Sequence, residues 1–255
     1  MLAPEALRDL VEGYLAELAL TPELGHQQDS MRYALEGGKR IRGVVCLGVA
    51  ESAGGDVAAA LPAAGALELV HAFSLVHDDM PALDDDDERR GRPSTHVAFG
   101  EGVALLAGDA LLVEAFRLAL SYATPAPARE LAQATLGMIG GQHLDITDAG
   151  ADLAELHRLK TGRLFAAAVG LGLWAANVDE PAQRPWRLFG EELGLLFQIV
   201  DDVLDGDGYA ARLGHDAARS LAGEAAERAR DRLAAIQADT SVLQQLVDGL
   251  AVRTA

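Results

Sequence analysis

Apolar side chains recur at three- and four-residue intervals along nearly the whole chain, interrupted by short clusters of glycine and proline. This spacing places the apolar residues of each segment on one face of an α-helix. Residues that favour strands are scarce, and aromatic residues make up 5% of the chain. The sequence therefore predicts an all-α bundle of helices. The expected helices span residues 4–19, 28–35, 39–53, 61–79, 100–122, 128–147, 151–177 and 183–205, with two or three more between 209 and 252.

The boundaries of the helix over 61–79 are assigned from two prolines. Pro62 is expected to open this helix, and Pro81 to bend or end it. Across the whole chain we find no break in composition and no repeat of fixed period. A single domain over residues 1–255 is therefore the expected organisation.

Charge and composition exclude several classes of partner. The net charge is −18, which argues against nucleic acids and anionic membranes, because both require a basic surface. Residues 1–20 lack a basic leader, and the apolar run 165–178 is too short to span a bilayer, so we expect neither a signal peptide nor a membrane span. The single cysteine, Cys46, excludes an internal disulfide framework and suits a reducing cytosol. We expect a cytoplasmic protein.

The densest cluster of charge lies between His77 and Gly91, directly after an apolar run. Two acids, a proline-bent spacer and a second run of acids precede the pair Arg89-Arg90. Carboxylate oxygens are hard ligands suited to Mg²⁺, and arginines pair with anions. An acidic loop can also be an ordinary solvated surface, but this order of residues favours metal-assisted handling of phosphate.

A second acidic cluster lies inside an otherwise apolar helical segment, 197–205. Gln198, Asp201, Asp202 and Asp205 are three or four residues apart, so they share one helix face. Taken alone, this face is more simply interpreted as solvated. Together with the first cluster, metal binding becomes the better interpretation, because buried carboxylates require cations.

The two clusters together predict a metal clamp. Asp78 lies two helical turns after His71 on the same face, and the bend at Pro81 would bring Asp84 back towards Asp78. Two such sets on facing helices would hold a diphosphate through several Mg²⁺ ions.

Basic residues gather in the segment Gly37–Arg42. Two glycines allow a close backbone approach, a helix is expected to start at about Lys39, and Lys39 and Arg42 would then share a face. This arrangement predicts a second anion site that uses no metal. The chain contains only two lysines, Lys39 and Lys160.

Six segments, in this order, resemble the polyprenyl diphosphate synthase family of trans-prenyltransferases, and its bacterial farnesyl diphosphate synthases in particular. The segments are Gly37–Arg42 (GGKRIR), His71–Pro93 (HAFSLVHDDMPALDDDDERRGRP), Leu106–Ala110 (LAGDA), Gly140–Asp145 (GGQHLD), Lys160–Gly162 (KTG) and Phe197–Asp205 (FQIVDDVLD).

The resemblance implies an all-α fold around a deep central cavity, and a homodimer. It also implies a Mg²⁺-dependent reaction in which an allylic diphosphate ionises, isopentenyl diphosphate attacks the carbocation and a proton is lost. By position it assigns Asp78, Asp84 and Asp201 as Mg²⁺ ligands, supported by Asp79, Asp202 and Asp205. Residues that bind the allylic diphosphate are Arg89, Lys160, Thr161 and Gln198. Residues that bind isopentenyl diphosphate are Lys39, Arg42, His71 and Arg90. The implied catalytic set is Asp78, Asp79, Asp84, Arg89, Lys160, Asp201 and Asp202.

Phe73 is the candidate for control of product length. It precedes Asp78 by five residues, about 7–8 Å along the helix, where a ring would form a floor to the cavity. A core phenylalanine is the simpler interpretation of the residue alone. The resemblance, with an aromatic at this position in short-chain synthases, favours a C15 product over C10 or C20.

Three departures from the family pattern leave an alternative open. Gly43 replaces a usual proline, which is expected to loosen the helix start, and the chain is somewhat short. After Asp205 the family's lysine-bearing loop is missing, with Arg212 or Arg219 as possible substitutes. The alternative is a weakened or regulatory subunit that acts through a partner synthase. A class I terpene cyclase is disfavoured by the sequence DDVLD, and a metal phosphohydrolase by the lack of an obvious water-activating base.

Overall fold

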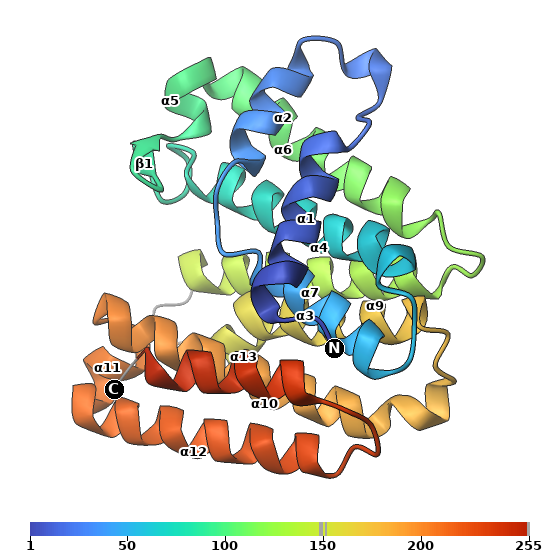
Figure 1. Ribbon diagram of the computed structural model, residues 1–255. Helices are drawn as coiled ribbons and strands as arrows, with labels where there is room; N and C mark the ends of the chain where they lie inside the picture. The colour runs from blue at the N-terminus through green and yellow to red at the C-terminus, as the bar shows by residue number, and fades with distance from the viewer. Residues whose placement is uncertain (148–149, 151, 254–255) are drawn as a thin grey trace.

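The computed structural model describes residues 1–147, 150 and 152–253 and is built from helices, as the sequence predicts (Figure 1). The elements are α1 (Pro4–Glu17), η1 (Pro22–Leu24), α2 (Gln27–Leu35), α3 (Ile41–Ser52), α4 (Val57–Asp78), β1 (Glu88–Arg89), β2 (Arg92–Pro93), α5 (Thr95–Phe99), α6 (Glu101–Ala119), α7 (Ala126–Thr147), α8 (Leu153–His157), η2 (Arg158–Gly162), α9 (Arg163–Ala175), η3 (Glu180–Gln183), α10 (Arg184–Asp205), α11 (Gly208–Leu213), α12 (His215–Ala234) and α13 (Ser241–Val252).

Helix α4 is the central element of the core. Its residues Ala66, Leu67, Leu69 and Val70 are all inaccessible to solvent, because α1, α3, α6 and α9 pack around it. By length and composition α4 could cross a membrane, but two thirds of its most apolar window is buried within the protein. The packing of the core accounts for its apolar surface.

The start of α4 differs from the sequence prediction. The helix begins at Val57, where the Asp56 carboxylate caps it by accepting a hydrogen bond from the backbone N–H of Ala58 at 3.0 Å. Pro62 therefore lies inside the helix and does not open it. At the other end the helix stops at Asp78, three residues before Pro81.

The helix expected over 151–177 is interrupted by a π-helical segment. Residue 151 lies outside the described residues, α8 runs from Leu153, and η2 carries one wider turn before α9. Such single π turns often occur at functional sites. Here the turn contains both Lys160 and Thr161.

The last helices cover the second acidic segment. Helices α12 and α13 pack against each other and against α10, and Figure 1 shows them at the bottom of the molecule. This cover buries the apolar face of α10, including Leu193, Leu196 and Ile199, so its opposite face, with Gln198 and Asp201, turns to the interior of the bundle.

Candidate active site

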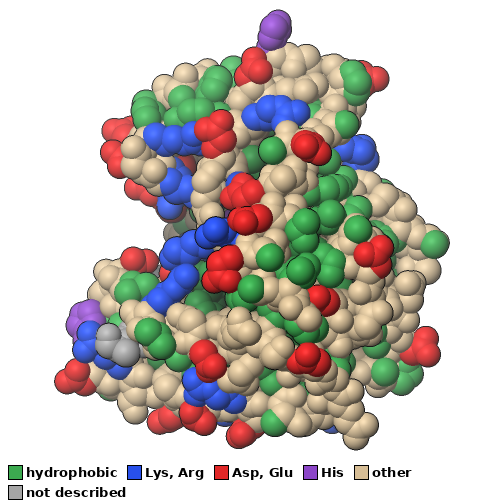
Figure 2. All heavy atoms as spheres, viewed as in Figure 1, with side chains coloured by type: hydrophobic (Ala, Val, Ile, Leu, Met, Phe, Trp, Pro, Cys, Tyr) green, Lys and Arg blue, Asp and Glu red, His purple; other side chains and the backbone are tan. Residues whose placement is uncertain are grey.

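A cavity of about 1460 Å³ opens between the two halves of the helix bundle. Pockets for a single small molecule are usually about 300–1,000 Å³, so this one has room for two ligands. In Figure 2 the molecule is hollowed on the left, and lysine and arginine side chains gather in the hollow. The predicted residues on its wall are Lys39, Arg42, His71, Phe73, Asp78, Arg89, Arg90, Lys160, Thr161, Gln198, Asp201, Asp202 and Asp205.

The first acidic wall comes from the end of α4 and the loop after it. The loop folds back at Pro81, so the backbone N–H of Asp84 donates to the carbonyl of Asp78 at 2.9 Å. Asp84 is exposed on this loop and is not part of the cavity wall. Burial, together with the nearby carboxylates of Asp84 and Asp79, raises the pKa of Asp78 to about 6, against the opposing charge of Lys160.

Asp79 has a different environment from Asp78. Its side chain is 3% exposed and accepts hydrogen bonds from Arg89, including one from Nε at 2.9 Å. Arg89 also contacts Asp86 at 3.0 Å. Asp79 therefore orients Arg89. The Oδ1 atom of Asp79 is occupied by this ion pair.

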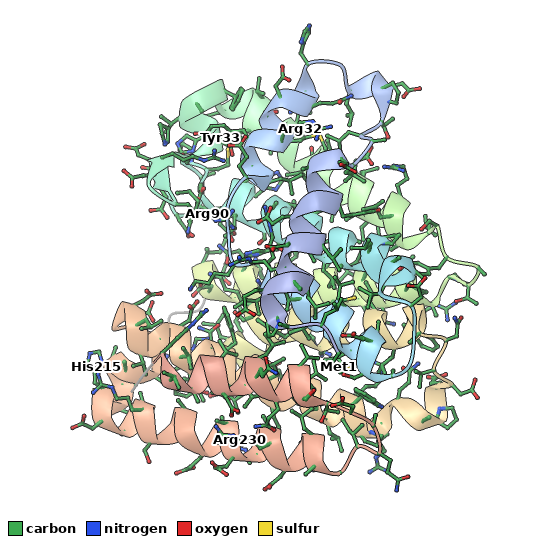
Figure 3. All side chains as sticks on the ribbon, viewed as in Figure 1. Met1, Arg32, Tyr33, Arg90, His215 and Arg230 are labelled. Atoms are coloured by element: carbon green, nitrogen blue, oxygen red, sulfur yellow. The ribbon has the colours of Figure 1, made fainter. Side chains whose placement is uncertain are left out.

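A two-residue turn places the paired arginines. Strands β1 and β2 pair antiparallel, and both residues of the turn between them, Arg90 and Gly91, have positive φ, 57° and 76°. This is the backbone expected of a tight type I′ hairpin. Figure 3 shows Arg90 at the edge of the hollow, where Nη1 donates to the carbonyls of Glu36 (3.1 Å) and Gly37 (3.0 Å).

The second acidic wall is the inner face of α10. Burial and the neighbouring Asp205 raise the pKa of Asp201. Burial alone would raise the pKa of Asp202 as well, but the His157 ring, with Nε2 3.3 Å away, and hydrogen bonds from the backbone N–H of Tyr209 (2.8 Å) and from Gln198 (2.6 Å) hold it below its usual value. Asp202 is therefore bound within the protein, whereas Asp201 remains available to a ligand.

The carboxylates of the two acidic walls are the candidate ligands for Mg²⁺. Within residues 1–147, 150 and 152–253, no three His, Cys, Asp or Glu side chains stand close enough to hold an ion alone. Asp78 lies on the first acidic wall of the cavity and Asp201 on the second, whereas Asp84 is exposed on the loop that follows Asp78. Mg²⁺ is usually bound by one or two carboxylates together with substrate phosphates and water. Burial is the main cause of the raised pKa of Asp78 and of Asp201, and a cation would stabilise the ionised form of both, so these two carboxylates fit the ion. The pKa of Asp84, which is exposed on the loop beyond Asp78, is raised as well.

Lys160 is held by a residue that the sequence predictions did not include. Its Nζ lies 2.6 Å from the Asp145 carboxylate on α7. Helix α7 and η2 approach so closely that a Cβ on Gly141 would stand 2.5 Å from the backbone nitrogen of Lys160. Asp145 belongs to the GGQHLD segment, and that was the only signal for it in the sequence.

The basic wall differs locally from the prediction. Gly37 and Gly38 have φ of 75° and 100°, Arg40 has φ of 52°, and α3 begins at Ile41. Lys39 therefore precedes the helix and does not share a helical face with Arg42, although both line the cavity. The Arg90 guanidinium packs directly on the backbone of Gly38 in this turn. A Cβ added to Gly38 would lie only 2.8 Å from that guanidinium.

The remaining predicted residues of this wall are Arg42 and His71. The guanidinium of Arg42 lies over the Phe165 ring at 4.8 Å, and its Nε is buried without a hydrogen-bond partner among the described residues. Burial, followed by the charges of Arg42 and Arg90, lowers the pKa of His71 well below its usual range. His71 is therefore neutral and can donate or accept a hydrogen bond at pH 7.

Gly43 does not loosen the start of α3, contrary to the expectation from the missing proline. Its backbone N–H donates to the buried Glu68 carboxylate at 2.8 Å. A proline has no N–H to offer. The side chain of Arg40, itself buried, binds Glu12 at 2.9 Å and lies 3.8 Å from Glu68, so the turn is anchored to both α1 and α4.

Phe73 lies on the cavity wall, and its ring packs edge-on against His77 at 4.9 Å between centroids. His77 in turn lies 3.1 Å from the Leu105 carbonyl on α6. Of the two arginines that could replace the missing lysines, Arg212 on α11 lines the cavity, whereas Arg219 is exposed and lies 3.8 Å from Asp216.

Comparisons with known proteins agree with this geometry. Residues 26–223 match the family described as polyprenyl synthetase. A geranylgeranyl diphosphate synthase of Cyanophora paradoxa is 42% identical over 209 residues, covering 76% of this chain and 70% of that protein. The large subunit 1 of a heterodimeric geranylgeranyl pyrophosphate synthase of Arabidopsis thaliana is also 42% identical, but this chain spans only 57% of its length.

Solved structures resemble the chain over nearly its full length. An FPP/GFPP synthase of Zymomonas mobilis superposes with a TM-score of 0.85 at 30% identity, covering 97% of this chain and 96% of that one. A geranyltransferase of Legionella pneumophila gives a TM-score of 0.85 at 32% identity, covering 98% and 94%. The chain therefore belongs to the polyprenyl synthetase family of prenyltransferases.

Proposed function

We propose that the protein joins isopentenyl diphosphate to an allylic diphosphate, dimethylallyl or geranyl, in a Mg²⁺-dependent head-to-tail condensation. The observation that carries this proposal is the presence of two acidic walls and a separate basic wall in one cavity. The acidic walls suit a diphosphate bound through metal ions, and the basic wall suits a diphosphate bound without metal. Only the first diphosphate would then ionise.

On the allylic side, Asp78, Asp84 and Asp201 would hold the Mg²⁺, which supplies charge neutralisation as the diphosphate leaves. Lys160 and Arg89 donate hydrogen bonds to the same diphosphate, and each is already oriented, by Asp145 and Asp79 respectively. Donors fixed in advance need little rearrangement as charge develops.

On the other side, Lys39, Arg42 and Arg90 bind isopentenyl diphosphate, with neutral His71 beside them. The C1–O bond of the allylic substrate breaks heterolytically, and its electron pair leaves with the diphosphate. The double bond of isopentenyl diphosphate then attacks C1, and the coupled product loses one proton. The apolar cavity wall, including Phe73, Met138 and Leu156, keeps water away from the cation.

We propose a C15 product, with C10 and C20 as the neighbouring possibilities. The support is the position of Phe73 on the wall beyond Asp78, where the ring shortens the space for a growing chain. Some relatives are named for longer products, geranylgeranyl and geranylfarnesyl diphosphate, whereas the structural neighbour from Zymomonas mobilis is named an FPP/GFPP synthase. Those names describe those proteins. The length of the product that this chain makes is proposed to depend on its own residue at the cavity floor, Phe73.

We also propose that the protein is a homodimer. The support is a set of exposed apolar residues on two neighbouring helices, which we call the α6–α7 stripe. It consists of Val103, Leu106 and Val113 on α6 and Leu136 on α7. Ile139 and Ile146 of α7 are also exposed, but they line the cavity and are not counted in the stripe. Exposed apolar residues arranged this way mark an interaction surface.

The direct test is to incubate the purified protein with Mg²⁺, labelled isopentenyl diphosphate and dimethylallyl or geranyl diphosphate, and to size the products. Turnover to a C15 product supports the proposal. Absence of turnover with both primers would favour the alternative, a regulatory subunit that acts through a partner synthase. The short segment after Asp205, which carries no lysine, is the observation behind that alternative.

A further inference from the structure

Gln142 is a polar residue of the cavity wall that the proposed mechanism leaves without a role. It lines the cavity on the inner face of α7, together with Met138 and Asp145. Both Oε1 and Nε2 of its amide are buried, and neither has a hydrogen-bond partner among the described residues. Buried amide groups are nearly always paired, so an unpaired one at a cavity wall points to a ligand.

The position of Gln142 is fixed by a close backbone contact at the residue before it. The preceding residue is Gly141, where α7 touches η2. A Cβ added to Gly141 would lie only 2.8 Å from the Cα of Lys160. This contact places the amide beside the segment that carries Lys160 and Thr161. The other amide on the wall, Gln198, is bound to Asp202 at 2.6 Å.

Along the cavity, Gln142 marks the boundary between its charged and apolar parts. Asp145, which holds Lys160, lies about 4.5 Å further along α7, and buried Met138 lies about 6 Å in the other direction. A bound allylic diphosphate has its leaving group at the charged end and its hydrocarbon chain at the apolar end. In that orientation, the carbon where they join would lie near the Gln142 amide.

An isoprenyl chain offers an amide no hydrogen-bonding group. Among the atoms of the allylic substrate, the amide can therefore interact only with the diphosphate oxygens or with the charge that forms on the allylic carbon. Resting on the function proposed above, we propose that Gln142 is a catalytic residue whose amide lies against the breaking C1–O bond. Oε1 faces the carbon that becomes positive, and Nε2 donates to the oxygen that takes the electron pair.

The variant Gln142→Met keeps the length of the side chain and removes the amide. The matched control is Gln133→Met, the same change at an exposed site on the same helix. In Gln142→Met, we expect kcat with geranyl diphosphate to fall about 10²-fold. KM for both substrates should change by less than about threefold, and the substrate-free protein should keep its Tm, because no protein hydrogen bond is lost. A kcat within about threefold of wild type would overturn the proposal.

A binding measurement tests the same claim without turnover. The probes are a geranyl analogue with an ammonium at the allylic position and its neutral carbon isostere, each titrated calorimetrically with inorganic diphosphate and Mg²⁺. Wild type should bind the ammonium compound at least about tenfold more tightly, and Gln142→Met should lose that preference. Equal affinities in wild type would overturn the proposal. If wild type shows the preference and Gln142→Met loses it, but wild type shows no turnover, the proposed function fails while the contact of the Gln142 amide with the allylic position stands.

Discussion

Asp78 and Asp79 are adjacent in the sequence but differ in what their carboxylates do. Asp79 is bound to Arg89, whereas Asp78 faces the cavity with a pKa raised to about 6 by burial. The family resemblance implies a direct role for Asp78 and a supporting role for Asp79, but it does not identify Arg89 as the partner of Asp79. The separation follows from the helix end at Asp78, after which the chain turns and Asp79 points to the hairpin.

Asp78→Asn is expected to stabilise the protein in EDTA at pH 7. Because the pKa of Asp78 is raised in the folded state, ionising it costs stability as the pH rises from about 4 to about 6. The variant should raise the free energy of unfolding in urea by roughly 1–3 kcal/mol at pH 7, with the difference vanishing below about pH 4.

The matched control is Asp79→Asn, which weakens the bond to Arg89. It should lower the free energy of unfolding at pH 7 by roughly 1–3 kcal/mol. If both variants shifted stability in the same direction, the distinction between a free and a bound carboxylate would be wrong.

Phe73→Ala is expected to lengthen the product by one or more C5 units, because removing the ring extends the cavity floor. The products are dephosphorylated and sized by chromatography and mass spectrometry. Phe116→Ala is the control, since Phe116 packs on the core without lining the cavity. Both variants should lose about 3–5 kcal/mol of stability at most, but only Phe73→Ala should change the product. An unchanged chain-length profile would remove Phe73 as the determinant.

At the scale of elements, the starts of α3 and α4 show what periodicity leaves undetermined. Helix existence and approximate range follow from the spacing of apolar residues, and the expected segments match the observed ones closely. The start of α4 depends on the Asp56 cap and that of α3 on three residues with positive φ. These are local backbone effects that an apolar pattern does not contain.

In the candidate site, too, some features can be predicted from the sequence and others depend on the folded structure. The sequence motifs contain about two thirds of the residues that line the cavity, because the chemistry of acids, bases and glycines is visible in them. The π turn at η2, the Arg90-Gly91 turn and the pairing of Lys160 with Asp145 depend on contacts between distant segments. Such tertiary contacts carry no local signal in one sequence.

Restoring the family's proline at the start of α3 should destabilise this protein. Gly43→Pro removes the N–H that binds Glu68 at 2.8 Å and places ring atoms against Val11, whose side chain lies 3.0 Å from where a Cβ would stand. We expect a loss of about 1–3 kcal/mol in the free energy of unfolding, measured in urea. Gly43→Ala keeps the N–H and isolates the steric part, so it should lose less. A proline variant at least as stable as wild type would contradict the role of Glu68.

At the scale of the whole molecule, the α6–α7 stripe should hold two copies together. Val113 is 68% exposed, and Val113→Asp would bury a charge in the proposed interface. Sedimentation analysis should find wild type as a dimer and the variant as a monomer. The control Val252→Asp changes a valine that is 70% exposed on α13 and should remain dimeric. A monomeric wild type would refute the interface.

The central claim is that one cavity holds two diphosphates in different ways, one through metal and one through basic side chains. It is tested by titration calorimetry with geranyl S-thiolodiphosphate, which does not ionise, and with isopentenyl diphosphate, each with Mg²⁺ and with EDTA. We predict that Mg²⁺ tightens binding of the allylic analogue by at least about 100-fold and that of isopentenyl diphosphate by less than about threefold. An equal dependence of both ligands on Mg²⁺ would contradict the account.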